Sequence, residues 1–463
     1  MFSKQIYTNR RANLLKSVDG GILLFVGNGE SGANYSGNDY KFRQDSSFLY
    51  FFGLDKPDLA AVIDIESGEE IIFGNDIDLD DIIWMGPQPS IAEQAAEVGV
   101  SRTAPLSALA DYIKSALAKG RKVHYLPPYR GDTKILLNQL LGIPFDALKD
   151  NASVEFIKGV VELRLIKEPC EIAEIDRACD LGYAMHYTAM ELLRLGMKEQ
   201  ELVGAMEGVV TSGGYMPSFP TILSQNGETL HNHSHHQIFT EGRLCVVDAG
   251  AEIESHYCSD FTRTLPSGGR FTERQKEIYN IVLAANNAAA SLSRPGISYR
   301  NVHLAASRVI LDGLKNVGLV KGDLDEALAN GVQGLFMPHG LGHNMGLDVH
   351  DMENLGENYV GYDATVSRSQ QFGLASLRMA RVLKPGHVIT DEPGIYFIPA
   401  LIEQWKAEGR LKDFINYSLL ESYYDFGGIR LEDDLLITPD GARRLGTRRL
   451  PITVEEVENV MAG

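Results

Sequence analysis

Cysteine is scarce in this sequence, with four residues among 463. Cys170, Cys179, Cys245 and Cys258 form no CxxC pair and no regular spacing, which excludes a small fold held together by disulfides. So few thiols in so long a chain suit a reducing compartment, and we expect a cytoplasmic protein. Cys258 stands two residues before Asp260 and would share its strand face. We do not expect Cys258 to bind a metal, because a metal site built from carboxylate oxygens does not need a sulfur ligand.

Long apolar runs and an excess of basic residues are also missing. No apolar stretch approaches the roughly 20 residues that a membrane-spanning helix needs. The first apolar run, residues 21–26, is typical of a strand and not of a secretion signal. The formal net charge is -19, from 43 basic and 62 acidic residues. An acidic chain without a basic stripe argues against nucleic acid and membranes as partners.

The N-terminal third reads as a small α/β domain. Short apolar runs broken by Gly, Asp and Pro alternate there with stretches of helical spacing. The whole chain is long enough for two or three domains with cores of their own. The expected strands are residues 22–26, 48–52, 59–65 and 122–126, and the expected helices are residues 91–98 and 106–118.

A domain boundary is expected near residue 160, which gives domains of residues 1–160 and 161–463. Pro169 suits the first turn of a long helix. The C-terminal part mixes long helices with strands that form hairpins, which predicts an α+β fold and not a doubly wound sheet. Its expected helices are residues 170–195, 199–211, 273–293 and 301–317, and its expected strands are residues 244–248, 257–265, 387–391 and 428–437.

Two aspartates stand on neighbouring predicted strands of this part. Asp248 ends an apolar run, and Asp260 follows twelve residues later. If the chain forms a hairpin that turns near Glu254, the two carboxylates come opposite each other and repel. A divalent cation between them removes the repulsion. The alternative is that one of them caps a turn or pairs with Arg263.

Two glutamates offer further oxygen ligands. Glu392 stands at the end of a predicted strand, just before a proline. Arg430 and Glu432 alternate along another strand and therefore share one of its faces. The neighbouring Asp433 and Asp434 are expected at a solvated edge or turn.

Three histidines, His339, His343 and His350, lie within twelve residues among glycines and apolar residues. With His343 as the one nitrogen donor, the chain offers four carboxylates and one imidazole. Oxygen-rich ligation favours Mn²⁺, Co²⁺ or Fe²⁺ over a structural zinc site. Four negative charges balance two divalent cations, and a pair of cations that share a water performs hydrolysis. The sequence therefore predicts a dinuclear hydrolytic centre.

These residues and their surroundings resemble aminopeptidase P and prolidase, which are metallopeptidases of the pita-bread fold. The matching words are VVDAG, SDFTRT, HGLGHNMGLDVHD, DEPGIYF and GIRLEDD, and the N-terminal FRQDSSF and IWMG also match. The resemblance spans nearly the whole chain. It implies a pita-bread catalytic domain preceded by a smaller α/β domain, and the metal ligands Asp248, Asp260, His343, Glu392 and Glu432.

The resemblance also implies which metal ion each ligand binds. Asp260 and Glu432 bridge two metal ions, Asp248 completes one ion, and His343 with Glu392 completes the other. A metal-bridging hydroxide attacks the carbonyl carbon of an Xaa-Pro bond. We expect two divalent metal ions per chain, with Mn²⁺ as the first choice and Co²⁺, Fe²⁺ or Zn²⁺ as alternatives.

Five further roles follow from the same resemblance. Glu392 matches the proton shuttle, and His231 matches a histidine that binds substrate. His339 and His350 match the histidines that stabilise the tetrahedral oxyanion and steer the leaving group. Arg430 matches an arginine that orients the ligands. A proline nitrogen carries no hydrogen and leaves as a secondary amine, so it needs a proton donor of this kind.

One departure from the family concerns the aspartate hairpin. Twelve residues separate Asp248 from Asp260, where the family usually has eleven. An extra residue would turn one side chain to the wrong face unless a bulge absorbs it. We therefore expect a bulge between Ile253 and Ser259.

A second departure is the long segment between the last histidine and Glu392. It contains Arg378, which aligns with an arginine that holds the free carboxylate of a dipeptide in eukaryotic-type prolidases. The alternative is an arginine on a helix surface. Three further histidines, His233, His235 and His236, match nothing in the family and are expected in a polar loop near the mouth of the site.

The favoured function is that of a metal-dependent Xaa-Pro aminopeptidase, acting on peptides with proline at position 2. The first alternative is an Xaa-Pro dipeptidase, or prolidase, that accepts dipeptides only. An alternative of another class is a non-catalytic pita-bread binding module. A homo-dimer or homo-tetramer is expected, and Trp84 matches a tryptophan that reaches a neighbouring active site in tetrameric relatives.

Overall fold

The computed structural model describes residues 2–463 and divides into two compact units. The first unit runs to Arg164 and includes Glu353–Tyr359; the second comprises Leu165–Met352 and Val360–Gly463. We retain residues 1–160 and 161–463 as the proposed domains.

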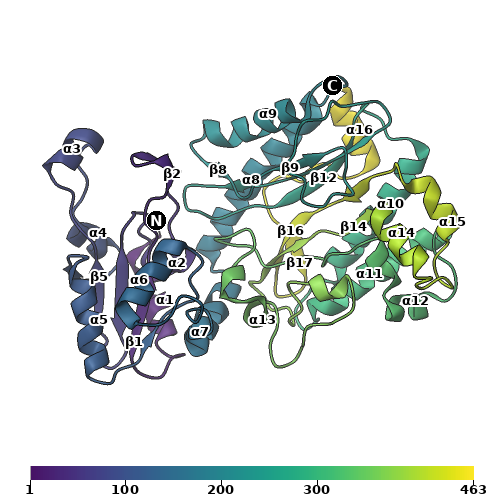
Figure 1. The fold of residues 1–463 in the computed structure, drawn as a ribbon. Helices are drawn as coiled ribbons and strands as arrows, with labels where there is room; N and C mark the ends of the chain where they lie inside the picture. Colours follow the sequence, from purple (N-terminus) through teal and green to yellow (C-terminus); the bar gives the residue numbers. More distant parts are fainter. Residues whose placement is uncertain (1) are drawn as a thin grey trace. The chain divides into compact units, whose positions relative to one another are not determined.

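The first unit is built on a five-stranded mixed sheet, drawn in purple and blue in Figure 1. Strand β1 lies between β4, to which it is antiparallel, and β7, to which it is parallel. Every residue of β4 is buried, as expected of a central strand covered on both faces. In the order β6-β5-β4-β1-β7, the strands are Arg102–Ala104, Glu70–Phe73, Ala60–Asp64, Ile22–Val26 and Val123–His124.

Helices pack against this sheet through an aromatic core. Phe25 of β1 contacts the rings of Phe51, Phe52 and Phe156 at centroid distances of 5.0–5.3 Å. The exposed hairpin of β2 (Gly32–Tyr35) and β3 (Asn38–Asp39) lies outside the sheet. The helices are α1 (Lys4–Leu14), α2 (Ser46–Phe52), α3 (Leu79–Met85), α4 (Ile91–Glu97), α5 (Ala108–Ala118), α6 (Gly131–Leu141) and α7 (Val154–Leu165).

The strand expected at residues 48–52 is wrong, because these residues form helix α2. The Asp45 carboxylate accepts the backbone N–H of Phe48 and caps the helix, and Gly53, with a φ of 65°, ends it. All seven residues of α2 are buried. A short apolar run without periodicity does not distinguish a buried helix from a buried strand.

The second unit contains several short antiparallel sheets that meet at the candidate site. Strand β10 pairs with β9 and β12, β16 pairs with β13 and β17, β14 pairs with β15, and β11 pairs with β8. The strands are β8 (Met216–Pro217), β9 (Ile222–Ser224), β10 (Leu244–Ala249), β11 (Ala251–Glu252), β12 (Phe261–Pro266), β13 (Val388–Asp391), β14 (Gly394–Tyr396), β15 (Gly428–Arg430), β16 (Asp433–Ile437) and β17 (Ala442–Arg444).

Long helices cover these sheets. Helix α8 packs on β10, β11 and β12, whereas α10 packs on β13, β14, β15 and β17 (Figure 1). Pro169 occupies the first turn of α8, as predicted. The helices of this unit are α8 (Pro169–Leu192), α9 (Glu199–Ser212), α10 (Glu273–Leu292), α11 (Tyr299–Asn316), α12 (Leu324–Asn330), α14 (Pro399–Ala407), α15 (Tyr417–Leu420) and α16 (Val454–Ala462), whereas all but the last residue of α13 (Glu357–Val360) belongs to the first unit.

Two strands expected here are shorter than predicted. The expected strand at residues 257–265 becomes β12, which begins at Phe261. The expected strand at residues 428–437 is broken into β15 and β16, and these pair with different partners, β14 and β13. The break leaves Glu432 between two strands, where its backbone N–H bonds to the carbonyl of Thr262 at 3.0 Å. This irregular position brings its side chain next to β12.

Candidate metal centre

The two aspartates lie on one face of the β10–β12 hairpin, but they are diagonal neighbours. The register pairs Asp248 with Thr262 and not with Asp260, which directly precedes β12. In an antiparallel pair, the residue two positions from the direct partner points to the same face, roughly 7–8 Å away. That separation leaves room for a cation between the carboxylates.

The extra residue of this hairpin is absorbed at its turn. Ile253 and Tyr257 are joined by a hydrogen bond at 3.2 Å, and the three residues between them form the loop. The last of these, His256, has a φ of 66°. A three-residue loop that ends in a left-handed residue forms a bulge at the hairpin end. The irregularity expected between Ile253 and Ser259 is located here, and the ladder beyond it keeps one register.

Glu432 is fixed beside Asp260 by Thr262. The hydroxyl of Thr262 donates to Oε2 of Glu432 at 2.6 Å, in addition to the backbone bond between the two residues. Glu392 follows β13 directly, and its backbone N–H bonds to the carbonyl of Leu341 at 2.8 Å. The two glutamates come from separate segments and line the same cavity.

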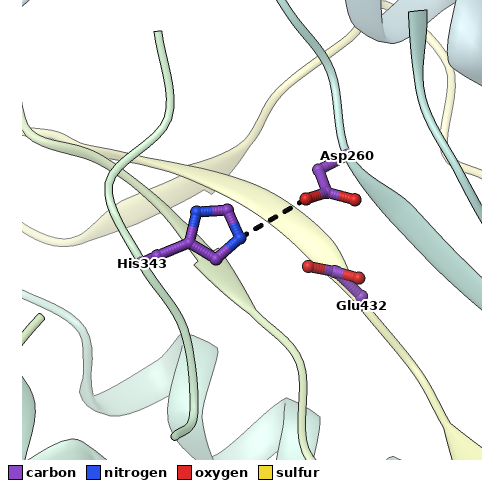
Figure 2. Close-up of side chains that lie close together, drawn as sticks. All are labelled: Asp260, His343 and Glu432. Atoms are coloured by element: carbon purple, nitrogen blue, oxygen red, sulfur yellow. Dashed lines mark ion pairs between the residues drawn. The ribbon is translucent and has the colours of Figure 1, made fainter. Parts of the chain in front are cut away.

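The imidazole of His343 completes the group. Its Nδ1–H donates to the carbonyl of Asn344 at 3.0 Å, which directs the lone pair of Nε2 toward the acids. Nε2 lies 3.4 Å from Asp260 and 3.7 Å from Glu392. Figure 2 shows His343, Asp260 and Glu432 pointing toward one another from three separate segments.

Two hydrogen bonds made by its own backbone hold His343 against Thr390 of β13. Its N–H bonds to the hydroxyl of Thr390 at 3.1 Å, and its carbonyl accepts the N–H of Thr390 at 2.9 Å. This close approach needs glycine at position 342, because a Cβ at Gly342 would lie 2.1 Å from the carbonyl oxygen of Thr390.

These side chains fit a divalent cation. Ligand atoms of Asp260, His343 and Glu432 all lie within 4.8 Å of one another. One oxygen each of Asp248 and Asp260 is buried without a hydrogen-bond partner among residues 2–463. Such orphaned acceptors are costly unless a ligand satisfies them. All five predicted ligands line one cavity of about 360 Å³.

The carboxylates also repel one another in the absence of a cation. Burial, followed by the charge of Asp248, raises the pKa of Asp260. Burial and the charge of Asp260 raise the pKa of Glu432 in the same way. Burial raises the pKa of Glu392, although the nearby His343 opposes this shift. Positive charge placed among these oxygens would relieve both the burial cost and the repulsion.

Arg430 is buried at one side of the cavity and holds three oxygen atoms. Its guanidinium forms an ion pair with Asp248, donates to the Tyr396 hydroxyl at 2.8 Å and donates to the Thr262 hydroxyl at 3.2 Å. Tyr396, Thr262 and Thr390 were not found from the sequence, because a lone hydroxyl residue carries no distinctive spacing.

His339 lies on the same side and is uncharged. Its Nδ1–H donates to the carbonyl of Gly340 at 2.7 Å, and its Nε2 accepts the Tyr396 hydroxyl at 2.9 Å. Burial, together with the charge of Arg430, lowers the pKa of His339 to about 3. The ring stands 3.8 Å from Glu392.

His350 and Arg378 line the opposite part of the cavity. The ring of His350 meets that of His343 edge to face at 4.2 Å. Arg378 donates to Nδ1 of His350 at 3.0 Å, so the proton of a neutral His350 lies on Nε2. Arg378 follows a short 3₁₀ helix and lines the cavity, so it is not an arginine on a helix surface.

The histidines of the loop after β9 have different environments, since two line the cavity and one is buried in the core. His231 and His233 line the cavity. Burial and the charge of Arg430 lower the pKa of His231. His235 is buried and contacts the carbonyl of Leu223 at 2.9 Å, so it anchors the loop. His236 is exposed and is not among the cavity-lining residues.

The expectation that Asp433 and Asp434 are solvated is wrong, since both are buried. Asp433 forms ion pairs with Arg263 at 2.7 Å and Arg444 at 2.6 Å, so Arg263 is bound there and pairs with neither ligand aspartate. Asp434 accepts the backbone N–H of Asp260 at 2.9 Å. Their burial follows from the break between β15 and β16, which the alternating pattern did not reveal.

Comparison with known proteins agrees with this geometry. Residues 173–439 match metallopeptidase family M24, and residues 7–125 match the aminopeptidase P N-terminal domain. The chain belongs to metallopeptidase family M24, in its Xaa-Pro aminopeptidase and prolidase group. The predicted fold, a pita-bread domain preceded by a smaller α/β domain, is thereby confirmed.

Its relatives include both kinds of enzyme. The chain is 32% identical to the Xaa-Pro dipeptidase of Homo sapiens, covering 96% of this chain and 90% of the relative. It is 32% identical to a probable Xaa-Pro aminopeptidase of Fusarium vanettenii, covering 91% and 88%. The aminopeptidase P of E. coli in complex with product matches with a TM-score of 0.80 at 31% identity, covering 100% and 98%.

Proposed function

We propose that the chain is an Xaa-Pro aminopeptidase that removes the N-terminal residue from peptides with proline at position 2. The observation that carries this proposal is the meeting of four carboxylates and His343 in one cavity, which further histidines also line. Divalent cations bound there supply Lewis acidity, which polarises a carbonyl and makes water a nucleophile near neutral pH.

Five side chains would hold two cations, of which Mn²⁺ is our choice from the donor set. Asp260 and Glu432 would both hold cations there, and Thr262 fixes Glu432 beside Asp260. Asp248 would serve one cation, and His343 with Glu392 would serve the other. The orphaned oxygens of the two aspartates support this assignment.

The remaining residues would bind the peptide and move protons. Glu392 takes a proton from the attacking water at its carboxylate and delivers it to the proline nitrogen, which otherwise leaves as a poor amide anion. His350 presents Nε2–H toward the developing oxyanion, and His339 helps to enclose it. His231 contacts the substrate from the opposite loop, and Arg430 orients Asp248.

A dipeptidase is the second candidate, and Arg378 is the observation that favours it. Its guanidinium lines the cavity on the side of His350. An arginine there can hold the free carboxylate of an Xaa-Pro dipeptide through paired hydrogen bonds. In a longer peptide, the proline carbonyl is part of an amide and offers no such charge.

Turnover of Gly-Pro and of a longer Gly-Pro-Xaa peptide separates the two activities. We expect faster cleavage of the longer peptide. If the dipeptide is instead cleaved rapidly, Arg378→Ala should lower kcat/KM for the dipeptide by about 10- to 100-fold, which corresponds to one lost charge-assisted contact of roughly 1.5–3 kcal/mol. The longer peptide should lose much less. Equal losses on both peptides would remove the carboxylate-binding role of Arg378.

A non-catalytic binding module is the alternative of another class. The presence of all five ligand residues around one cavity argues against it. Metal analysis of the purified protein separates the two classes, because the enzyme should retain divalent metal and the binding module should retain none.

We further propose that the chain forms a homo-oligomer through helix α3. This helix has seven residues and none of them is buried. Its Ile83, Trp84 and Met85 are 66%, 85% and 60% exposed. A helix this short is unstable alone in water, and an exposed apolar cluster of this kind marks an interaction site. A second copy of the chain is the proposed partner.

Among residues 2–463, no helix is both long and apolar enough to cross a membrane. We propose a cytoplasmic location on the scarcity of cysteine alone.

A further inference from the structure

Lys167 and Asp351 form a buried ion pair next to the segment that contains His350. Nζ of Lys167 lies 2.8 Å from Oδ2 of Asp351, and both side chains are 1% exposed. Neither residue lines the cavity. Lys167 is itself held in place, because its backbone N–H bonds to the carbonyl of Gly386 at 2.8 Å. The pair therefore lies outside the site described above.

Asp351 closes an irregular loop of residues 344–351. Its backbone N–H bonds to the carbonyl of Asn344 at 2.9 Å, and its Oδ1 accepts the N–H of Asp348 at 3.3 Å. The pair packs tightly on the loop backbone, because a Cβ at Gly346 would lie 2.8 Å from Oδ2 of Asp351 and 2.9 Å from Cε of Lys167. The loop is therefore held by this ion pair and by single hydrogen bonds, and not by a helix or a strand.

The residue after this closure is strained. Met352 has a φ of 62°, a left-handed conformation that non-glycine residues seldom adopt. Such a backbone persists only where the surrounding contacts hold it. Asp351, which forms the ion pair, directly precedes Met352, so the pair fixes the chain on one side of it. Loss of the pair would let this backbone relax.

His350 directly precedes Asp351, so its ring position depends on the same closure. The ring contacts His343 and accepts a hydrogen bond from Arg378, and small backbone shifts would break both contacts. Buried ion pairs contribute little net stability compared with apolar residues of the same size. A role in fixing geometry therefore explains the pair better than a role in stability.

We propose that Lys167 and Asp351 are positioning residues, which hold the loop so that His350 faces the substrate. The inference rests on the proposed peptidase function for its effect on rate, but the placement of the His350 ring is a property of the chain itself. Lys167 acts from the segment that precedes α8, remote in sequence from every ligand.

The test uses the double variant K167M/D351N in the full-length protein with Mn²⁺. Both substitutions are nearly isosteric and neutral, so no unpaired charge stays buried, and the amide oxygen introduced at position 351 still accepts the N–H of Asp348. We expect kcat for a Gly-Pro-Xaa peptide to fall by about 10- to 100-fold, the range for a slightly misplaced catalytic group. The affinity for Mn²⁺ alone should stay within about twofold.

The exchange R443M/D176N provides a control at a more exposed ion pair, whose side chains are 41% and 23% exposed. Arg443 and Asp176 also form an ion pair, at 2.7 Å, and neither residue lines the cavity. Activity of this control should stay within about twofold of the wild type. Equal losses in the two double variants would show a general structural effect and overturn the proposal.

A cycle with His350→Ala identifies the residue through which the pair acts. If the pair acts through His350, K167M/D351N should lower kcat no further in the His350→Ala background. Additive losses would overturn the proposal. The imidazole ¹⁵N resonances of His350, assigned with His350→Ala and recorded on the metal-free protein because Mn²⁺ is paramagnetic, give a readout that does not need activity.

These resonances should shift or broaden in K167M/D351N and stay unchanged in R443M/D176N. Unchanged resonances would overturn the proposal even if the rate falls. An inactive wild type would contradict the peptidase function instead, and the resonances would then decide the positioning role by themselves.

Discussion

Arg430 controls the orientation of Asp248 by occupying one of its two oxygens. The guanidinium is buried and also bonds to Tyr396 and Thr262, so it has little freedom to move. The second oxygen of Asp248 is left without a partner among residues 2–463. A carboxylate fixed in this way presents one oxygen toward the cavity, which is the arrangement that a metal ligand requires.

Replacement of this arginine should therefore weaken one cation site. We expect Arg430→Met to lower the affinity for one of two Mn²⁺ equivalents by about 10- to 100-fold, the usual effect of losing a residue that orients a ligand. Calorimetric titration of the metal-free protein with Mn²⁺ measures this directly. Arg443→Met, outside the cavity lining, is the control, and equal affinities in both variants would contradict the role of Arg430.

At the residue scale, the ligand types and their order could be predicted from sequence, because carboxylates at strand ends and His343 in a glycine-rich segment form a distinctive pattern. The partners of these ligands could not. Tyr396, Thr262 and Asp434 act through hydrogen bonds between distant parts of the chain, and no sequence spacing predicts such contacts.

At the scale of elements, helix α11 contributes a buried histidine to the core. His303 is 1% exposed, and neither ring nitrogen has a hydrogen-bond partner among residues 2–463. Burial, with the nearby charge of Arg300, lowers the pKa of His303 to about 4. The helix thus packs well only while this ring is uncharged.

Acid should destabilise the protein through His303. In the unfolded chain the pKa of His303 returns to about 6.5. Between pH 6.5 and about 4, His303 is therefore protonated in the unfolded state but not in the folded state. The free energy of unfolding therefore falls as pH falls, by about 1.4 kcal/mol per pH unit, and is unaffected by this group above pH 6.5.

His303→Leu removes this contribution. Between pH 7 and pH 5, the wild type should lose about 2 kcal/mol more unfolding free energy than the variant. Urea unfolding of both proteins at the two pH values, followed by circular dichroism, measures the difference. Parallel losses in the two proteins would show that His303 is not the proton acceptor.

The elements themselves were predicted unevenly. The long helices α8, α10 and α11 follow clear apolar spacing and caps, and they begin within two residues of the predicted positions. Helix α2 was mistaken for a strand because all its residues are apolar or small and buried. The break between β15 and β16 was missed because alternation continues through it, although the two strands change partners there.

At the scale of the whole molecule, the exposed helix α3 predicts self-association. A capping box of Asp78 and Asp81 begins this helix, and none of its seven residues is buried. We expect light scattering after size exclusion to give a mass of two or four chains. The variant I83S/W84S should shift this mass toward a single chain, whereas Leu117→Ser, at another exposed apolar position, should not. A monomeric wild type would contradict the proposal.

The sequence alone established the family and the arrangement of a small α/β domain before a pita-bread domain, because the motifs span nearly the whole chain. It could not choose between an aminopeptidase and a dipeptidase, since that choice depends on the free space and charge around Arg378. The structure adds a cavity in which Arg378 meets His350.

The central claim is that the five ligand side chains hold two cations that make this chain a peptidase. The most direct measurement is the rate of Gly-Pro-Xaa hydrolysis by the metal-free protein as Mn²⁺ is added. The account predicts no hydrolysis without metal and a rate that reaches its maximum near two equivalents per chain. Full activity in the presence of a chelator, or none at any level of Mn²⁺, would contradict it.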